Sequence, residues 1–334
     1  MSSVAIAILN YNGESHLKKF LPTLIANSSD YPVYVGDNAS TDNSVKLLKN
    51  EFQNVKCIEF KENSGYSKGY NKLINKINAD YIALVNSDIE ATPNWLPPLV
   101  TILENNKEIA AVQPKIKSWS NKELFEYAGA AGGYVDKYGY PLCRGRLFDT
   151  LERDTGQYDN KVEISWASGA CFLVRKSSFD KAGGFDDDFF AHMEEIDLCW
   201  RFHTMGLKMI YTPESTVYHV GGGTLDYSSP FKTFLNYRNG LYLLLKNLPK
   251  ENLQQTIVIR VLLDWLSIIY NVLKGKLKLA QAILKAHKEV LVTRKHFLNK
   301  RKSPNDGSSA YRKDYSVVWN YFLKGKKYFN QLPD

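Results

Sequence analysis

The first 88 residues alternate short apolar segments with amphipathic ones, and this alternation constrains the fold more than any other feature. The apolar segments predict strands over Val4–Leu9, Pro32–Gly36, Val55–Phe60 and Tyr81–Val85. The amphipathic segments predict helices over Glu14–Asn27, Ser44–Glu51 and Ser67–Ile77. Such alternation is typical of an α/β fold with a Rossmann-like, mostly parallel sheet and helices on both faces.

Polar residues follow each of these four strands. They form the segments Asn10–Gly13, Asp37–Asp42, Asn63–Tyr66 and Asn86–Asp88. Ligands of open α/β sheets bind beyond the carboxyl ends of the strands. The sequence therefore predicts that these four segments, although distant along the chain, line one crevice.

The rest of the chain changes in character near residue 225. Before that point, the pattern predicts further strands at Val112–Ile116, Gly169–Val174 and Lys208–Thr212. After Thr224 it predicts long helices over Phe231–Leu248 and Asn252–Leu273. We expect one domain over residues 1–225 and a basic, mainly helical C-terminal region over residues 226–334, with the boundary near Thr224 or Tyr227.

The net charge of +8 belongs to the C-terminal region. From Asp226 onward the chain has 20 Lys and Arg residues against 7 Asp and Glu, whereas the first 225 residues have 23 against 28. An apolar helical face around Trp265, followed by lysines, suits the interface of an anionic membrane. It suits equally well a helix packed on the first domain with its lysines in water. No nucleic-acid-binding module accompanies the charge, so nucleic acid is not an expected partner.

The sequence also predicts a cytoplasmic protein that could lie peripherally on the inner face of the membrane. No apolar run approaches the roughly 20 residues of a membrane-spanning helix. The apolar start at Val4–Leu9 lacks the basic flank of a secretory signal. The four cysteines form no C-x-x-C pair, so reduced thiols are expected.

Asp88 ends the segment Asn86-Ser87-Asp88 and could hold a divalent ion, which neutralises and orients a diphosphate leaving group. By itself, an aspartate after a strand is more often a turn or cap residue. The carboxylate and amides of Asp37–Asp42 strengthen the case, because they suit a pyrimidine ring. Asp42 itself is expected to cap the following helix.

Two later positions could also carry chemistry. An acidic cluster contains Glu194, Glu195 and Asp197, and transfer to a hydroxyl requires a base of this type. For one of the three carboxylates, a favourable place at a helix start is the expected role. His219, beside a glycine-rich segment, is either a structural hydrogen-bonding residue or a metal ligand.

Eight stretches, in order, resemble the family 2 glycosyltransferases of the GT-A fold, in particular the bacterial rhamnosyltransferase-like and galactofuranosyltransferase-like branch. They are V-A-I-A-I-L-N-Y-N, G-D-N-A-S-T-D-N-S, N-S-G-Y-S-K-G-Y-N, N-S-D, W-A-S-G-A, G-G-F-D, E-E-I-D-L-C-W-R and H-V-G-G-G-T. The resemblance implies an inverting, metal-dependent enzyme of cell-surface polysaccharide synthesis. Its donor would be dTDP-rhamnose or a UDP-sugar, and its acceptor a hydroxyl of a glycan or polyprenyl-linked molecule.

The resemblance also implies residue roles. Asp37 resembles the aspartate that contacts the nucleotide base. The nucleotide-sugar site would comprise Asn10, Asn12, Asp37, Gly65, Ser87, Asp88, Trp166, Ser168 and Gly169. Asp88 resembles the last residue of the D-x-D motif, with His219 and Asn86 completing a site for Mn²⁺ or Mg²⁺. Glu195 stands in the place of the general base, and Glu194 is the alternative.

Two residues depart from the family's pattern, and one other class of protein stays open. Asn86 replaces the first aspartate of D-x-D, and Glu195 is longer than the expected aspartate. A nicotinamide oxidoreductase would need G-x-G-x-x-G after the first strand, and a sugar nucleotidyltransferase would need a glycine-rich loop with arginine there. A non-catalytic nucleotide-sugar-binding or membrane-surface scaffold protein remains the alternative, although it gives Asp88, Glu195 and His219 no purpose.

Overall fold

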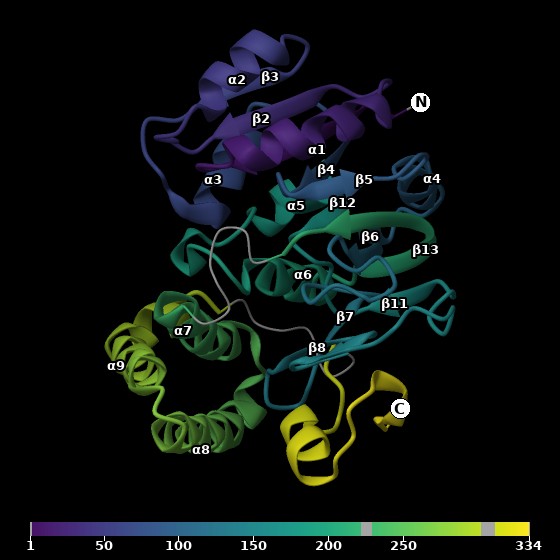
Figure 1. Cartoon of the computed structure of the whole chain (residues 1–334). Coiled ribbons are helices and arrows are strands. Elements are labelled where there is room, and N and C mark those ends of the chain that lie inside the picture. Colours follow the sequence, from purple (N-terminus) through teal and green to yellow (C-terminus); the bar gives the residue numbers. More distant parts are fainter. Residues whose placement is uncertain (1, 222–228, 302–310, 334) are drawn as a thin grey trace.

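The computed structural model describes residues 2–221, 229–301 and 311–333, and a nine-stranded sheet forms its centre (Figure 1). The strands are β1 Val4–Asn10, β2 Val33–Asp37, β3 Lys56–Glu59, β4 Tyr81–Val85, β5 Ile89–Ala91, β6 Ile109–Ser118, β11 Val162–Ile164, β12 Cys171–Arg175 and β13 Lys208–His219. Their order is β11-β13-β6-β12-β4-β1-β2-β3, and β5 pairs with β13.

The N-terminal part of this sheet is parallel, as predicted. β4, β1, β2 and β3 run parallel to one another, and β6 runs parallel to β13. β12 runs antiparallel to both β4 and β6. β13 is longer than the predicted Lys208–Thr212 and continues to His219, after a register shift between Thr212 and Thr216. His219, the final residue of β13, therefore lies at the same edge at which β1, β2 and β4 end.

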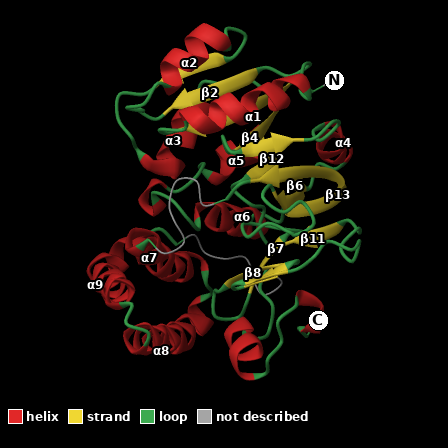
Figure 2. Ribbon diagram, viewed as in Figure 1, coloured by secondary structure: helices red, strands yellow, loops and turns green. Residues whose placement is uncertain are grey.

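Helices cover both faces of the sheet (Figure 2). They are α1 Glu14–Ala26, α2 Ser44–Glu51, α3 Gly65–Ile74, α4 Pro97–Asn105, α5 Lys176–Ala182 and α6 Glu194–Thr204. Successive side chains of β1 point to opposite faces. Ile6 belongs to an apolar cluster with Leu21 of α1, whereas Ala7 belongs to another with Leu73 of α3 and Ile196 of α6. The predicted coverage of both faces is confirmed.

A second, antiparallel sheet was not predicted. Its strands are β7 Gly133–Val135, β8 Pro141–Cys143, β9 Arg146–Leu147 and β10 Thr150–Leu151. They are two or three residues long and lie in the segment rich in Gly and Tyr. Such short strands have no run of alternating apolar residues from which a strand could be predicted.

The C-terminal region is mainly helical, as expected. Its elements are α7 Pro230–Asn247, α8 Lys250–Leu273, α9 Leu277–Asn299 and two short helices at Trp319–Leu323 and Phe329–Gln331. Leu241 and Leu244 of α7 belong to the same apolar cluster as Ala7 of the central sheet. This region thus completes the core of the first domain. The proposed boundary at Thr224 or Tyr227 lies outside the described residues.

α8 corrects one expectation drawn from the sequence. Among the described residues it is the one helix long and apolar enough to cross a membrane, judged by length and composition. Counting uninterrupted apolar residues missed it, because Arg260 and Asp264 break the run in sequence. Only 22% of its most apolar window is buried in the protein.

Candidate active site

Asn10 and Asp37 end two neighbouring parallel strands and face each other across β1 and β2. The side-chain amide of Asn10 donates to Asp37 Oδ2 at 3.0 Å. Ser40 donates its backbone N–H to Asp37 Oδ1 at 2.8 Å and its hydroxyl to Oδ2 at 2.6 Å. Asp37 is buried, and Asn10 Oδ1 is a buried acceptor without a partner. The pair forms a fixed polar floor at the carboxyl end of the sheet.

The loop residues above this floor hold the two N-terminal helices in place. Asn12, with a φ of 51°, accepts the backbone N–H of Thr41 at 2.7 Å. Asp42 accepts the backbone N–H groups of Glu14 and Ser44, each at 3.0 Å, where α1 and α2 begin. Asp42 was expected to be the N-cap of the following helix, but that residue is Asn43, and Asp42 instead binds the first backbone N–H of both α1 and α2.

The segment that contains Gly65 lies against the same edge. Asn38 donates to Asn63 Oδ1 at 3.0 Å and to the carbonyl of Gly65 at 3.1 Å. Gly65 has a φ of +78°, and a Cβ there would lie 2.7 Å from the carbonyl oxygen of Phe190. Only glycine allows this approach of the chain to the loop before α6. The predicted crevice thus joins segments near residues 10, 38 and 65.

Asp88 and His219 form the centre of the candidate metal site. Asp88 is buried between β4 and β5, with Oδ1 3.2 Å from His219 Nε2. Its other oxygen accepts the backbone N–H of Gly221 at 3.2 Å. Asn86 Nδ2 lies 3.5 Å from His219 Nε2. Ser87 lies beside the first loop, since a Cβ on Gly13 would be 3.4 Å from its hydroxyl.

Glu126 also belongs to this cluster, and sequence reasoning missed it. Its Oε2 lies 3.3 Å from Nδ1 of His219, on the far side of the ring from Asp88. Burial opposes the charged form of His219, but Asp88 and Glu126 together raise its pKa to about 10. Burial likewise opposes ionisation of Asp88, yet His219 lowers the pKa of that carboxyl below its usual value. A single glutamate in an irregular loop carries no sequence signal for this role.

The donor atoms at this site suit Mn²⁺ or Mg²⁺. If an ion binds here, Asp88 would supply carboxylate oxygen and Asn86 amide oxygen, and His219 would supply imidazole nitrogen once its Nε2 proton is released. Cations of this kind commonly complete their shells with substrate phosphate and water. A carboxylate on the distal ring nitrogen, such as Glu126, is the usual partner of a metal-binding histidine. No group of three His, Cys, Asp or Glu side chains is arranged as a metal cluster within residues 2–221, 229–301 and 311–333. The protein alone would therefore supply only part of the coordination.

Glu194 and Glu195 begin α6, and the backbone that leads to them is unusual. Phe190, His192 and Met193 all have φ between 63° and 71°, which is left-handed backbone. The Oε2 atoms of both glutamates are buried without hydrogen-bond partners. Burial raises the pKa of Glu195 to about 7 and raises that of Glu194 well above its usual value, with a further contribution from Glu195.

The third carboxylate, Asp197, has a structural role, which comes from buried ion pairs and not from the place at a helix start that was expected for one member of the cluster. It is fully buried and lies 2.8 Å from both Arg201 Nη2 and Lys246 Nζ. Asn247 donates to its other oxygen at 2.8 Å. Burial opposes its ionisation, but Arg201 and Lys246 lower the pKa of Asp197 to about 2. Asp197 therefore fastens α6 to α7 and has no free oxygen for substrate.

Gly169 connects the glutamates to the Asp88 loop. Tyr66 donates its hydroxyl to the Gly169 carbonyl at 2.7 Å, and a Cβ on Gly169 would lie 3.8 Å from the carboxyl carbon of Glu195. The next carbonyl, of Ala170, accepts the backbone N–H of Asn86 at 2.9 Å. Glu195 and the Asn86–Asp88 segment therefore both adjoin one short backbone stretch.

Trp166 and Ser168, which were predicted to line the sugar site, are buried beside Gly169. Trp166 is buried and donates its indole N–H to the Tyr134 carbonyl at 2.9 Å. Ser168 is also buried, and its hydroxyl donates to the Ala128 carbonyl. Because both polar groups are already paired, these side chains support the fold around Gly169, and their contact with the sugar stays a prediction.

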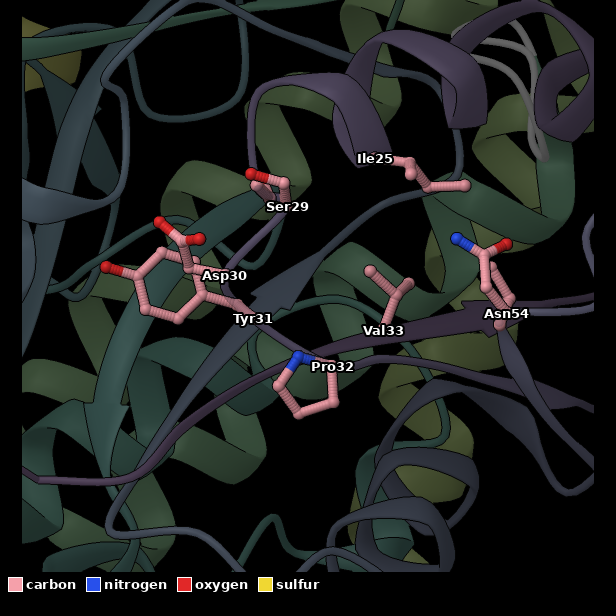
Figure 3. A pocket seen from close by; sticks show the side chains of 9 residues that line it. Ile25, Ser29, Asp30, Tyr31, Pro32, Val33 and Asn54 are labelled. Carbon is pink, nitrogen blue, oxygen red and sulfur yellow. The ribbon is translucent and has the colours of Figure 1, made fainter.

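A hollow elsewhere in the protein is not part of this site (Figure 3). Its lining includes Ile25, Ser29, Asp30, Tyr31, Pro32, Val33 and Asn54. Pro32 and Val33 stand at the amino end of β2, whereas Asp37 stands at its carboxyl end. The hollow is therefore at the wrong edge of the sheet for a ligand of the polar loops.

The sheet and its polar carboxyl edge define a glycosyltransferase of the GT-A type. The family model described as glycosyl transferase family 2 matches residues 4–183, which is more than half of the chain. The chain belongs to this family, and it is rhamnosyltransferase-like, because its relatives include rhamnosyltransferases.

Two curated relatives illustrate that likeness. An N-acetylglucosaminyl-diphospho-decaprenol L-rhamnosyltransferase of Mycobacterium tuberculosis is 26% identical over 231 residues, which cover 64% of this chain and 75% of that protein. The rhamnosyltransferase WbbL of Escherichia coli is 25% identical over 225 residues, which cover 65% of this chain and 83% of that protein.

Solved structures share the fold at lower identity. GalNAc-T7, with UDP, GalNAc and Mn²⁺, aligns with a TM-score of 0.58 at 17% identity, over 73% of this chain and 48% of that one. The chain thus spans about half the length of GalNAc-T7. The mannosyltransferase PcManGT of Pyrobaculum calidifontis, with GDP-Man and Mn²⁺, aligns with a TM-score of 0.52 at 12% identity, over 87% of each chain. These likenesses establish the GT-A fold.

Proposed function

We propose that this glycosyltransferase moves a sugar from a nucleotide-diphosphate donor to an acceptor hydroxyl with inversion at the anomeric carbon. The donor is dTDP-rhamnose or a UDP-sugar, and the acceptor is a glycan or a polyprenyl-linked saccharide of cell-surface polysaccharide synthesis. The names of two relatives, both rhamnosyltransferases and one acting on a decaprenol diphosphate, support this substrate class.

One observation supports the proposal: carboxyl groups in opposite environments adjoin the same Gly169–Ala170 backbone, Glu195 beside Gly169 and the segment that contains Asp88 beside Ala170. Asp88 lies beside His219, which favours its ionised form. Glu195 has a buried oxygen without a partner, so its carboxylate is a stronger base than usual. Groups whose pKa values are pushed apart by their surroundings commonly divide charge stabilisation and proton transfer between them.

The division of roles follows from these environments. Glu195 accepts the proton of the acceptor hydroxyl, whose oxygen forms a bond to the anomeric carbon while the bond from that carbon to the diphosphate oxygen breaks. A single displacement inverts the configuration at that carbon. Asp88, His219 and Asn86 would hold the divalent ion, Mn²⁺ or Mg²⁺, which when bound neutralises negative charge on the departing diphosphate.

The polar floor provides for the nucleotide. Asp37 and Asn10 are oriented by each other and by Ser40, so little conformational freedom is lost when a base pairs with them. Asn12 and the glycine at position 65 border the same edge. Ser87 and Gly169 adjoin the position expected for the diphosphate and sugar.

We place the reaction in the cytoplasm, at the inner face of the membrane, because a polyprenyl-linked acceptor is held there by its lipid. A relative of this chain acts on a decaprenol diphosphate by name, which supports an acceptor of this kind.

The test is thermal shift against a panel of nucleotide-sugars, with and without manganese, because a ligand that binds the folded state raises its apparent stability. We expect a manganese-dependent rise with dTDP-rhamnose or one UDP-sugar, followed by manganese-dependent hydrolysis of that donor. Binding without any hydrolysis or transfer would favour a nucleotide-sugar-binding scaffold instead.

A further inference from the structure

α8 buries a pair of charged residues and leaves much of its apolar surface exposed. Its fully buried positions recur every four residues and are Thr256, Arg260, Asp264 and Ile268. Its exposed apolar side chains are Val258, Leu262, Trp265, Leu266, Ile269, Tyr270, Val272 and Leu273. A surface helix of a water-soluble domain normally has the opposite orientation. The apolar side of α8 therefore faces away from the protein that α8 packs against.

A network of buried polar contacts fixes this orientation. Arg260 donates to Asp264 Oδ1 at 3.0 Å and to the Gly139 carbonyl at 3.3 Å. Tyr140 donates its hydroxyl to Asp264 Oδ1 at 3.0 Å, and His287 Nε2 lies 3.1 Å from Oδ2. Turning α8 to bury its leucines would leave this charged pair without partners, which is costly. The fold therefore holds the apolar face of α8 outward.

The exposed face of α8 carries no charge. Between Glu251 and Lys274, the charged residues of α8 are Arg260 and Asp264, and both are buried. Leu266 is 62% exposed and Leu273 81%. Single exposed apolar residues are ordinary on protein surfaces, but a contiguous stripe of this length marks a contact surface.

A second apolar element stands at the same end of the protein. Trp319, Phe322 and Leu323 of the short helix Trp319–Leu323 are 55%, 62% and 67% exposed. Val317, just before this helix, donates its backbone N–H to Asp136, at the turn between β7 and β8 that also binds Arg260. Figure 1 shows α8 and this helix together at the end of the molecule far from α2.

Basic residues border both apolar elements. Lys274, Lys276 and Lys278 are exposed in the turn from α8 into α9. Lys324 is exposed directly after Leu323. Lysines attract anionic headgroups, and tryptophan and tyrosine side chains prefer the boundary between lipid and water. An anionic bilayer complements both parts, because its acyl chains accept the uncharged stripe and its headgroups the basic border.

We propose that the apolar docking face, made of the exposed side of α8 and Trp319–Leu323, seats this protein on an anionic phospholipid bilayer. α8 lies in the plane of the lipid surface with its apolar side chains among the acyl chains near the headgroups. It does not cross the bilayer, because Arg260 and Asp264 stand at its middle and are bound to the β7–β8 turn.

This inference deepens the proposed function, on which it rests for its purpose: docking would bring the active site to a lipid-linked acceptor. The surface itself is argued independently of catalysis. Vesicle binding and donor hydrolysis therefore test the two proposals separately.

The experiment is co-sedimentation of the full chain with vesicles of phosphatidylcholine, alone or mixed with phosphatidylglycerol. We expect the unmodified chain to bind the mixed vesicles. The double variant Leu266→Glu/Ile269→Glu should bind them with an affinity reduced roughly tenfold or more, since two charges would enter the interface. Asn50→Glu/Gln53→Glu is the matched control, because it adds the same charges to exposed positions on and directly after α2, away from the apolar docking face. It should bind as the unmodified chain does, apart from a small electrostatic loss.

Several outcomes would overturn the inference. The first is absence of binding to the mixed vesicles, and the second is an equal loss of vesicle binding in both double variants. The third is a dimer in sedimentation velocity that Leu266→Glu/Ile269→Glu dissociates, because a second copy of the chain would then cover the apolar docking face. Resistance of the bound chain to carbonate extraction would show a spanning helix instead. Metal-dependent donor hydrolysis without vesicles should be unchanged in both variants. If the chain binds vesicles but hydrolyses no donor, the proposed function is refuted and the membrane proposal is not.

Discussion

Asn239 of α7 donates its side-chain amide to the carbonyl of His192 at 2.7 Å, across 47 residues of sequence. The same amide also donates to the carbonyls of Phe189 and Ala191, each at 2.9 Å. These carbonyls lie in the segment that leads into α6 and contains the positive-φ residues Phe190, His192 and Met193, and this segment positions Glu195. A residue of the C-terminal region thus holds the backbone on which the proposed base stands.

Asn239→Leu should therefore impair transfer more than donor binding. The Phe189 carbonyl keeps Arg238 and the backbone N–H of Ala191 as donors, but the Ala191 and His192 carbonyls lose the Asn239 amide. An unpaired buried carbonyl costs roughly 1–3 kcal/mol, and part of that cost is relieved when the loop moves and Glu195 is displaced. We expect kcat to fall roughly tenfold or more, with donor affinity in calorimetry nearly unchanged. Asn299→Leu, at an exposed position of α9, is the control. A normal kcat in folded Asn239→Leu would refute the positioning role.

Glu195→Gln should retain donor binding and lose turnover, because glutamine cannot accept the proton. Glu194→Gln is the matched variant at the adjacent position, and it should keep measurable activity. If instead Glu195→Gln is active and Glu194→Gln is not, the base is Glu194.

The pH dependence of transfer provides a separate test of Glu195. Burial raises the pKa of its carboxyl to about 7, so the base is protonated below that pH. We expect kcat to rise with pH up to about 7 and then level. At pH values between the pKa of Glu195 in the unfolded chain and its raised pKa in the native state, the native state binds more protons than the unfolded chain. The free energy of unfolding therefore falls as pH rises through this range. Thermal unfolding of Glu195→Gln should accordingly gain stability relative to the unmodified chain on going from pH 5 to pH 8.

Asp88→Ala should abolish manganese-dependent donor binding. Asp88 is the single carboxylate of the proposed ligand set, because Asn86 is neutral, so its loss removes the only negative charge that faces the ion directly. Calorimetric titration of the donor, with and without manganese, measures the effect. Asp30→Ala, at an exposed position beside the unrelated hollow, should bind as the unmodified chain does. Unchanged manganese-dependent affinity of Asp88→Ala would remove Asp88 from the metal site.

Lys246→Met should destabilise the whole protein. Lys246 is buried and lies 2.7 Å from Asp186 and 2.8 Å from Asp197, so its removal leaves two buried carboxylates less compensated. Breaking a buried ion pair from one side costs about 3–5 kcal/mol. Urea unfolding at neutral pH should show a loss of this order, whereas Lys250→Met, exposed at the start of α8, should show little change. A loss below about 1 kcal/mol would mean that Arg201 alone compensates Asp197.

The sequence determined the sheet, its helices and the edge at which chemistry takes place. The strand at Tyr81–Val85 was predicted to the residue, and most other boundaries differ by one to three residues. This succeeded because buried parallel strands require uninterrupted apolar residues and their loops do not. Asn10, Asp37, Gly65 and Asp88 could be grouped on this basis, since parallel strands end at a common edge.

Only the tertiary structure decided which partners these residues meet. Glu126 reaches His219 from an irregular loop, and Asn239 reaches His192 from a distant helix, because packing brings together segments that have no shared periodicity. Trp166 and Ser168 have the residue types of a sugar site, yet their polar groups are already paired inside the core. The direction of α8 was likewise undetermined by its pattern. Its apolar stripe could face in or out, and the buried pair Arg260–Asp264, satisfied only by the β7–β8 turn and His287, turned it outward.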